Sequence, residues 1–105
     1  MAQAALSTVS TGRYLIDGEM SFATVEQLLV DSHPLFAADS SLLFDLSGVQ
    51  HADSAGVALL VEWLRLAKQK QRQLHFRNIP AQMLAIIEVS DLEQRLPISD
   101  GTQKP

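Results

Sequence analysis

The sequence lacks cysteine altogether, and it lacks any apolar run near the roughly 20 residues that a membrane-spanning helix needs. Without cysteine there is neither a disulfide framework nor a thiolate metal site, which fits a reducing compartment. The opening residues, MAQAALSTVSTGRYL, also lack the basic segment and apolar core of a signal peptide. We therefore expect a soluble cytoplasmic chain that reaches a membrane only through a partner.

An excess of positive charge is missing as well. Eight Lys and Arg residues stand against twelve Asp and Glu residues, giving a net charge of −4 that argues against a general nucleic-acid binder. The 105 residues are 47% hydrophobic and 19% charged, an ordinary globular composition. This length predicts one domain over residues 1–105, ending in a polar tail at 98–105.

Hydrophobic periodicity predicts alternating strands and helices. Residues 1–8 are expected to be a frayed end or a weak edge strand, and a short turn at 90–96, with a capping box from Ser90 to Glu93, is expected before the tail. Between them we predict strands at 11–20, 42–46 and 74–79, and helices at about 21–31, at 54–71 and from Pro80 onward. This order predicts an α/β fold whose largely parallel sheet has about four to five strands with three to four helices.

The first helix carries several end signals. Ser21 is a candidate N-cap, and Thr24 with Gln27 forms a candidate capping box one turn later. Pro34 is expected to end the helix, at about residue 31. Its predicted buried stripe consists of Phe22, Val25, Leu28 and Leu29.

The stretch 42–71 is expected to organise the chain, because a buried strand, a polar loop and a long helix follow one another there. Asp53 is a natural N-cap, and Ser54 would begin the helix on a solvent-exposed corner. At 100° per residue the helix has an apolar arc about 200° wide, more than packing on one neighbour requires. Either a partner covers part of this arc, or two other helices flank it. Small residues at Ala58 and Val61 continue a line from Ser54 to Arg65.

Residue chemistry gives little support for catalysis. His51 lies three residues before Ser54, but the G-x-S-x-G elbow of a nucleophilic serine is absent. His33 and His75 lack metal-ligand spacing, and no nucleotide-binding glycine motif occurs. Asp45 is predicted to order the following loop by accepting backbone N–H groups. We therefore expect no enzyme activity, metal or cofactor.

Ser54 has two interpretations. It is either a hydroxyl at the helix end without further role, or a phosphorylation site. A phosphate there would meet free N–H groups at the positive end of the helix dipole.

The stretch FDLSGVQHADSAGVALLVEWLRLAKQKQRQLHFRNIP resembles the core of a STAS domain, the fold of bacterial anti-sigma factor antagonists. The family pattern is a strand ending in D-x-S, a short loop, and D-[ST]-x-G opening a long helix. Here Asp45, Ser47, Asp53, Ser54 and Gly56 match it. The resemblance covers about residues 10–97 and implies a mixed, mostly parallel sheet.

Within this family the chain is most similar to the cytoplasmic STAS subunits of phospholipid-transport ABC complexes in Gram-negative bacteria. The resemblance implies a non-catalytic subunit that binds the transporter ATPase, in a complex with permease and substrate-binding subunits at the inner membrane. That transporter maintains outer-membrane lipid asymmetry. The alternative is an anti-sigma factor antagonist switched when a partner kinase phosphorylates Ser54. The residues expected to contact the partner are Asp53, Ser54, Ala55, Val57, Ala58, Val61 and Arg65.

Overall fold

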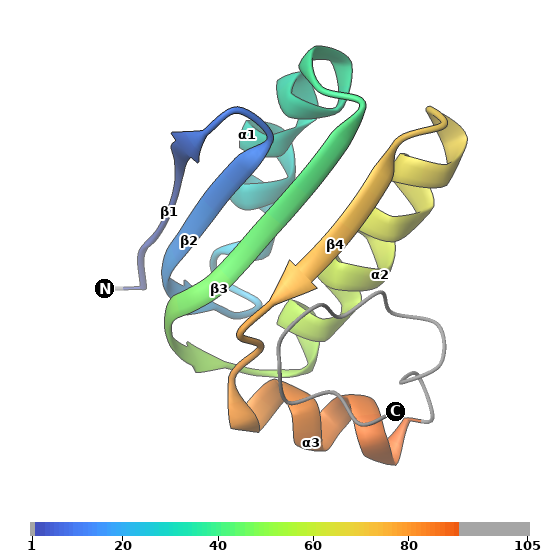
Figure 1. Cartoon of the computed structure of the whole chain (residues 1–105). Helices are drawn as coiled ribbons and strands as arrows, with labels where there is room; N and C mark the ends of the chain where they lie inside the picture. The colour runs from blue at the N-terminus through green and yellow to red at the C-terminus, as the bar shows by residue number, and fades with distance from the viewer. Residues whose placement is uncertain (1, 91–105) are drawn as a thin grey trace.

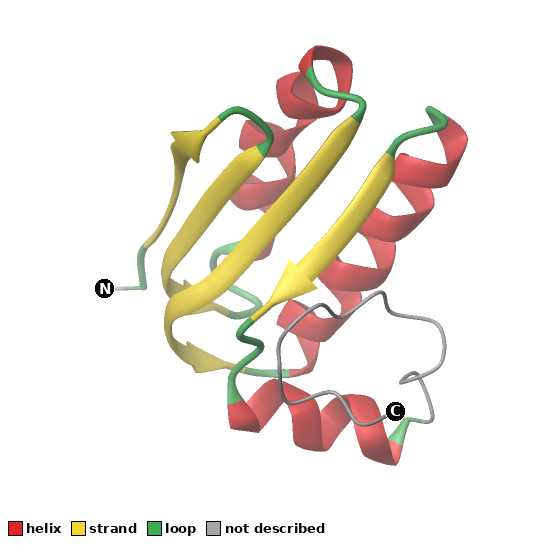
Figure 2. Ribbon diagram, in the orientation of Figure 1, coloured by secondary structure: helices red, strands yellow, loops and turns green. Residues whose placement is uncertain are grey.

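The computed structural model describes residues 2–90, which form four strands and three helices (Figures 1 and 2). In chain order these are β1 (Ala4–Ser10), β2 (Arg13–Met20), α1 (Val25–Ala38), β3 (Ser41–Ala52), α2 (Ser54–Gln69), β4 (Gln73–Arg77) and α3 (Ala81–Val89). The predicted turn at 90–96 with its capping box, and the tail at 98–105, lie outside the described residues apart from Ser90.

The sheet is mixed and mostly parallel, as predicted. Its strand order is β1-β2-β3-β4, with β1 antiparallel to β2 and the other two pairs parallel. The weak segment at the start of the chain is thus an edge strand rather than a frayed end. α1 connects β2 to β3, and α2 connects β3 to β4, as parallel pairing requires of its crossovers.

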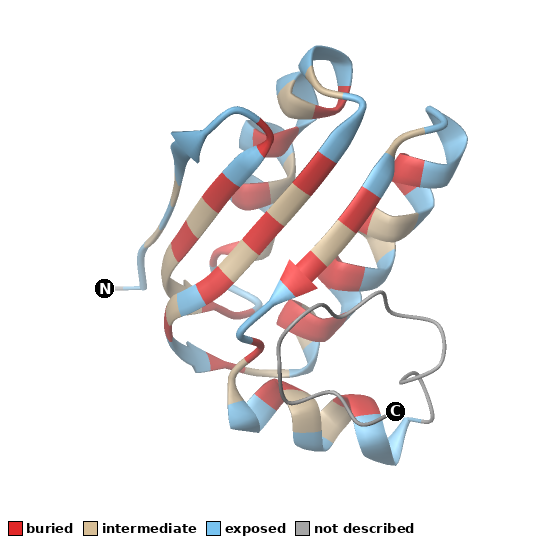
Figure 3. Cartoon of the chain, viewed as in Figure 1, coloured by how far each residue is buried: buried red, intermediate tan, exposed pale blue. Residues whose placement is uncertain are grey.

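Helices α1 and α2 lie side by side on one face of the sheet, and α3 lies near the end where α2 begins (Figure 1). Buried and exposed residues alternate along the strands (Figure 3) because successive side chains of a strand point to opposite faces. Tyr14 and Ile16 face the helices, whereas Arg13 is exposed, as predicted. The centre of the core is aromatic: Phe44 packs edge-on against Phe36 and Trp63.

Helix α1 differs from its prediction at both ends. Thr24 is the N-cap but makes no side-chain cap bond, because its hydroxyl donates to the Glu19 carbonyl at 2.6 Å. The predicted partner Gln27 instead donates to Asp31 at 2.8 Å. Pro34 does not end the helix, which continues to Ala38. Proline removes one helical hydrogen bond. If the helix ended at Pro34, however, the fully buried Phe36 would be withdrawn from the core.

Strand β3 is longer than predicted. The expected loop at 47–52 is wrong, because the strand runs on to Ala52 and stays paired with β2, with Met20 opposite Ala52. Two register irregularities accommodate the polar stretch. The role predicted for Asp45 is confirmed, since its carboxylate accepts from the Ser47 backbone N–H at 2.9 Å.

Tyr14 should make the folded state less stable at alkaline pH. Burial, together with a hydrogen bond that its hydroxyl donates to Asp39, raises the pKa of Tyr14 to about 12. The unfolded chain releases this proton near pH 10 while the folded chain keeps it, so stability is lost as the pH rises from about 10 to 12. The loss should approach about 2 kcal/mol. Urea unfolding across this range measures it, and a Tyr14→Phe variant with an equally steep decline would contradict the assignment.

Candidate functional site

Asp53 builds the corner at which β3 passes into α2. Its side chain caps the helix as predicted, because one carboxylate oxygen accepts from the Ala55 N–H at 2.9 Å. The other accepts from the Phe22 N–H at 3.3 Å, and the Asp53 N–H donates to the Met20 carbonyl at 3.2 Å. One residue thereby fixes the start of α2 against the segment that follows β2.

Ser54 is the first residue of α2 and its side chain is exposed. Within residues 2–90 its hydroxyl makes no hydrogen bond to a histidine, and His51 lies on β3. The hydroxyl sits where free helical N–H groups and the dipole favour an anion. Within residues 2–90, no base is hydrogen-bonded to this hydroxyl as a nucleophile would require, and its position suits a modification or a contact.

The line predicted along α2 is present on the surface. Ser54, Ala58 and Arg65 are exposed, and Val61 is 38% exposed. Arg65 forms a bidentate ion pair with Glu62: Nε lies 3.1 Å from Oε1, and Nη2 lies 2.6 Å from Oε2. The name "Ser54 surface" is used below for Asp53, Ser54, Ala55, Ala58, Val61 and Arg65.

Val57 departs from the expectation that it contacts a partner freely. It is only 3% exposed and belongs to the core, so its contribution is limited to the floor of a hollow.

The wide apolar arc of α2 is explained by two flanking helices, the second of the two explanations that the sequence left open. Helices α1 and α3 flank α2, and the sheet lies beneath it. Trp63, Leu60 and Leu66 are all buried there.

Two hollows border the Ser54 surface, and both include Ala58. The first, of about 580 Å³, lies between α1 and α2, and the second, of about 330 Å³, lies between α2 and α3. Residues from α1 and its N-terminal approach, Phe22, Val25, Glu26 and Leu29, line the first; Ile86 of α3 contributes to the second. The exposed small side chain at Ala58 leaves both hollows open along one continuous surface.

Phe22, which lines the hollow between α1 and α2 beside the Ser54 surface, was missed by the sequence prediction as a site residue. It was expected in the buried stripe of the first helix, yet it precedes α1 and is 86% exposed. An aromatic ring exposed to this extent beside an apolar hollow is typical of an interaction site. The overlooked signal is the Ser21–Thr24 segment, whose hydrogen bonds make the helix begin later in the sequence, at Val25. Thr24 Oγ1 accepts from the Ser21 N–H at 3.0 Å.

Asp45 lies on the other face of the sheet from the helices. Partial burial acts to raise its pKa, but hydrogen bonds from Asn78 and Ser47 and the nearby Arg77 charge outweigh it, so the pKa lies below its ordinary value. The carboxylate is thus ionised and occupied, which suits an ordering role.

No helix in residues 2–90 is both long and apolar enough to cross a membrane. In the same part of the chain, no three His, Cys, Asp or Glu side chains gather closely enough to hold a metal ion.

The strand order and the arrangement of the helices are those of the STAS fold. The structure of the Bacillus cell-fate determinant SpoIIAA in its phosphorylated form matches with a TM-score of 0.70 at 20% identity, covering 96% of this chain and 93% of that one. A STAS domain protein from Planctomyces limnophilus matches with a TM-score of 0.70 at 19% identity, covering 98% and 93%. The murine anion transporter Slc26a9 matches with a TM-score of 0.62 at 16% identity, covering 93% of this chain and 20% of that one.

A family model described as "Mlab, STAS domain" matches residues 7–98, and the chain belongs to this family. None of the curated protein sequences matches the chain. STAS domains are generally non-catalytic regulatory or interaction domains. The matches at these identities establish the fold, and the site must supply the function.

Proposed function

We propose that the chain is an MlaB-like STAS subunit that binds and supports the cytoplasmic ATPase, MlaF-like, of a phospholipid-transport ABC complex. In this role it stays in the cytoplasm and is held at the inner membrane through the ATPase, the permease and the substrate-binding subunits. The complex would maintain outer-membrane lipid asymmetry. The family description supports this proposal, and the observation that carries it is the apolar surface between α1, α2 and α3.

That surface has the composition of a protein interface. Phe22 offers a large aromatic side chain, and Ala55 with Ala58 lets a partner approach the helix backbone closely. The exposed Ser54 and Arg65, with the half-buried Glu62 paired to Arg65, form part of its polar rim. An apolar centre with a polar rim is typical of stable interfaces, in which a few buried anchors supply most of the binding energy.

Ser54→Glu should weaken binding to the purified ATPase at least tenfold. The new carboxylate would lie unpaired in the contact, where burial of a charge costs more than about 1.4 kcal/mol. The same charge at a helix N-terminus should leave the free protein as stable as before, or stabilise it slightly. Titration of labelled protein with the ATPase, alongside thermal unfolding of each variant, separates the two effects.

Two controls make this test specific. Ser54→Ala removes the hydroxyl without adding charge and should retain binding. Ser10→Glu places the same charge at the exposed end of β1, away from α2, and should also bind normally. Equal affinity of Ser54→Glu and the wild type would contradict the assigned surface.

The second candidate is an anti-sigma factor antagonist controlled by phosphorylation of Ser54. Its support is the exposed hydroxyl at the start of α2, and the similar fold of SpoIIAA, solved in unphosphorylated and phosphorylated forms. A phosphate on Ser54 would gain backbone N–H donors there. To discriminate the two functions, the chain is incubated with the purified serine kinase and ATPase candidates encoded beside its gene, and binding and phosphate transfer to Ser54 are measured. Binding to the ATPase supports transport, whereas phosphate transfer to Ser54 without ATPase binding supports regulation.

A further inference from the structure

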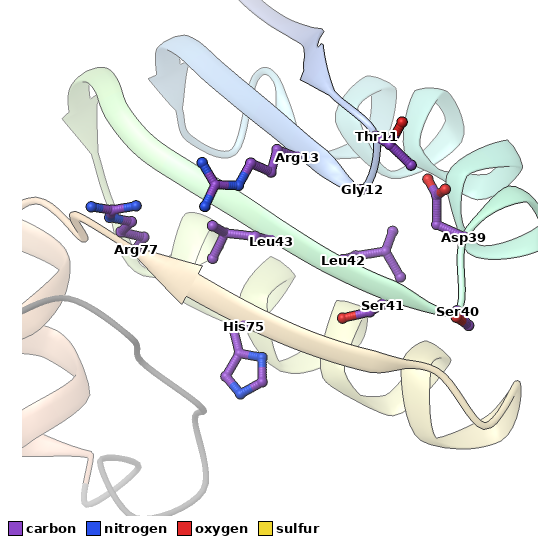
Figure 4. Close-up of a pocket in the computed structure, with 10 residues that line it drawn as sticks. All are labelled: Thr11, Gly12, Arg13, Asp39, Ser40, Ser41, Leu42, Leu43, His75 and Arg77. Carbon is purple, nitrogen blue, oxygen red and sulfur yellow. The ribbon is translucent and has the colours of Figure 1, made fainter.

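The face of the sheet opposite α1 and α2 carries its own hollow, of about 610 Å³ (Figure 4). Strand register sets its residues in rows: Arg13 of β2 lies opposite Leu43 of β3, and Leu43 lies opposite His75 of β4. Arg77 occupies the next position of β4 on this face. Arg13 and Arg77 therefore rise from the strands on either side of β3, offset by two residues along the strands, which places them about 12 Å apart at the backbone. The name "Arg13–Arg77 hollow" is used for Thr11, Arg13, Ser41, Leu43, His75 and Arg77.

The arginines of this hollow have no salt-bridge partner among residues 2–90, whereas the nearby carboxylates accept hydrogen bonds. Within residues 2–90 neither Arg13 nor Arg77 forms a salt bridge, and both are exposed. Asp45 is opposite Arg77 in the strand register, and Asp39 lies at the Thr11 end of the hollow (Figure 4); both carboxylates already accept hydrogen bonds. Asp45 accepts from Ser47 and from the Asn78 amide at 3.0 Å, and Asp39 accepts from Tyr14. The arginines thus retain donors for an anion while the neighbouring carboxylates have partners.

The rest of the lining would hold the remainder of a small molecule. Leu43 provides a half-buried apolar floor between the arginines, and His75 is opposite it on β4, with its ring directed away from Leu43 in Figure 4. Thr11 and Ser41 add exposed hydroxyls toward the other end. The volume falls within the range of about 300–1,000 Å³ typical of small-molecule sites.

We propose that the Arg13–Arg77 hollow binds a small molecule carrying a phosphate group. The phosphate lies over Leu43 and accepts from both guanidinium groups, whose planar donor arrangement matches phosphate oxygens. Its polar remainder extends toward Ser41 and Thr11. Because the sheet separates this site from the Ser54 surface, it does not depend on which partner binds there.

Nuclear magnetic resonance titration of the full chain tests this site, with inorganic phosphate and glycerol 3-phosphate as probes. Ionic strength is held constant with chloride, because screening alone would alter exposed charges. We expect saturable shifts of the Arg13, Leu43 and His75 amides, and tighter binding of glycerol 3-phosphate than of phosphate, because its polar remainder reaches Ser41 and Thr11. Glycerol alone should produce no such shifts.

Arginine variants supply the decisive comparison. Arg13→Gln and Arg77→Gln each remove charge-assisted bonds and should weaken binding about tenfold. Arg65→Gln, on the helical side and already paired with Glu62, is the matched control and should bind like the wild type. Shifts that do not saturate, or that persist equally in Arg13→Gln and Arg77→Gln, would overturn the proposal. Equal weakening in all three variants would also overturn it, because it would reflect net charge alone.

Discussion

Trp63→Ala should lower the free energy of unfolding by about 3–5 kcal/mol. Trp63 is fully buried at the centre of the core, where its ring lies 4.8 Å from that of Phe44 and 6.4 Å from that of Phe76, centroid to centroid. The truncation removes these contacts and leaves a cavity. Domains of this kind are stable by only about 5–15 kcal/mol, so the variant should be close to unfolding. Urea denaturation followed by far-ultraviolet circular dichroism measures the loss.

Trp63→Phe is the matched control. It keeps most of the aromatic packing but removes the indole N–H, which donates to the Ser32 hydroxyl at 2.7 Å. Ser32 still donates to the Leu29 carbonyl at 2.8 Å, so no buried donor is stranded. The expected cost is therefore smaller, about 1–2 kcal/mol. If Trp63→Ala were as stable as Trp63→Phe, packing around this ring would not dominate the core.

Gly56→Ala should destabilise the protein by about 1–3 kcal/mol, reversing the usual effect of this substitution in a helix. Alanine normally gains about 1 kcal/mol over glycine in a helix interior. Here its methyl group would lie 2.5 Å from the Met20 carbonyl oxygen and 3.1 Å from the Met20 Cβ. Because the nearer atom belongs to the backbone, α2 can relieve the clash only by moving away from the end of β2.

Ala58→Gly provides the reciprocal control two residues further along α2. Ala58 is exposed, so the change should cost only the helix propensity, about 1 kcal/mol, without a clash. Gly56→Ala should in addition weaken binding at the Ser54 surface, since the start of α2 shifts, whereas Ala58→Gly should leave the helix in place. Thermal unfolding and the ATPase titration measure the two quantities. A stabilised Gly56→Ala variant would contradict the close approach of α2 to β2.

The regular parts of the fold follow from local patterns in the sequence. The alternation of Tyr14 and Ile16 with Arg13 gave the correct faces of β2, and the Asp53 cap gave the start of α2. Both depend on interactions within one element or its nearest neighbours. The order of strands and helices was predictable for the same reason, because parallel pairing requires the intervening crossovers.

The incorrect predictions concern elements whose neighbours lie far away in the sequence. Residues 47–52 form a strand rather than a loop because they pair with β2, which is distant in the sequence. Pro34 stays within α1 because Phe36 packs on Phe44. Phe22 was assigned to the helix by periodicity, but Asp53, 31 positions away, accepts its N–H. The proposed contact surface shows the same division: helix spacing predicted the line of residues along α2, but the hollows beside it depend on α1 and α3.

The two hydrogen bonds that the Asp53 carboxylate accepts, from Phe22 and from Ala55, have a consequence for protein engineering. This carboxylate joins the start of α2 to the segment after β2, so the proposed recognition corner consists of two segments of the chain rather than one. A chimera that transplants residues 53–69 alone into another STAS domain would carry the serine but leave behind Phe22, whose N–H binds Asp53. Specificity should therefore transfer only when residues 20–24 move together with the helix.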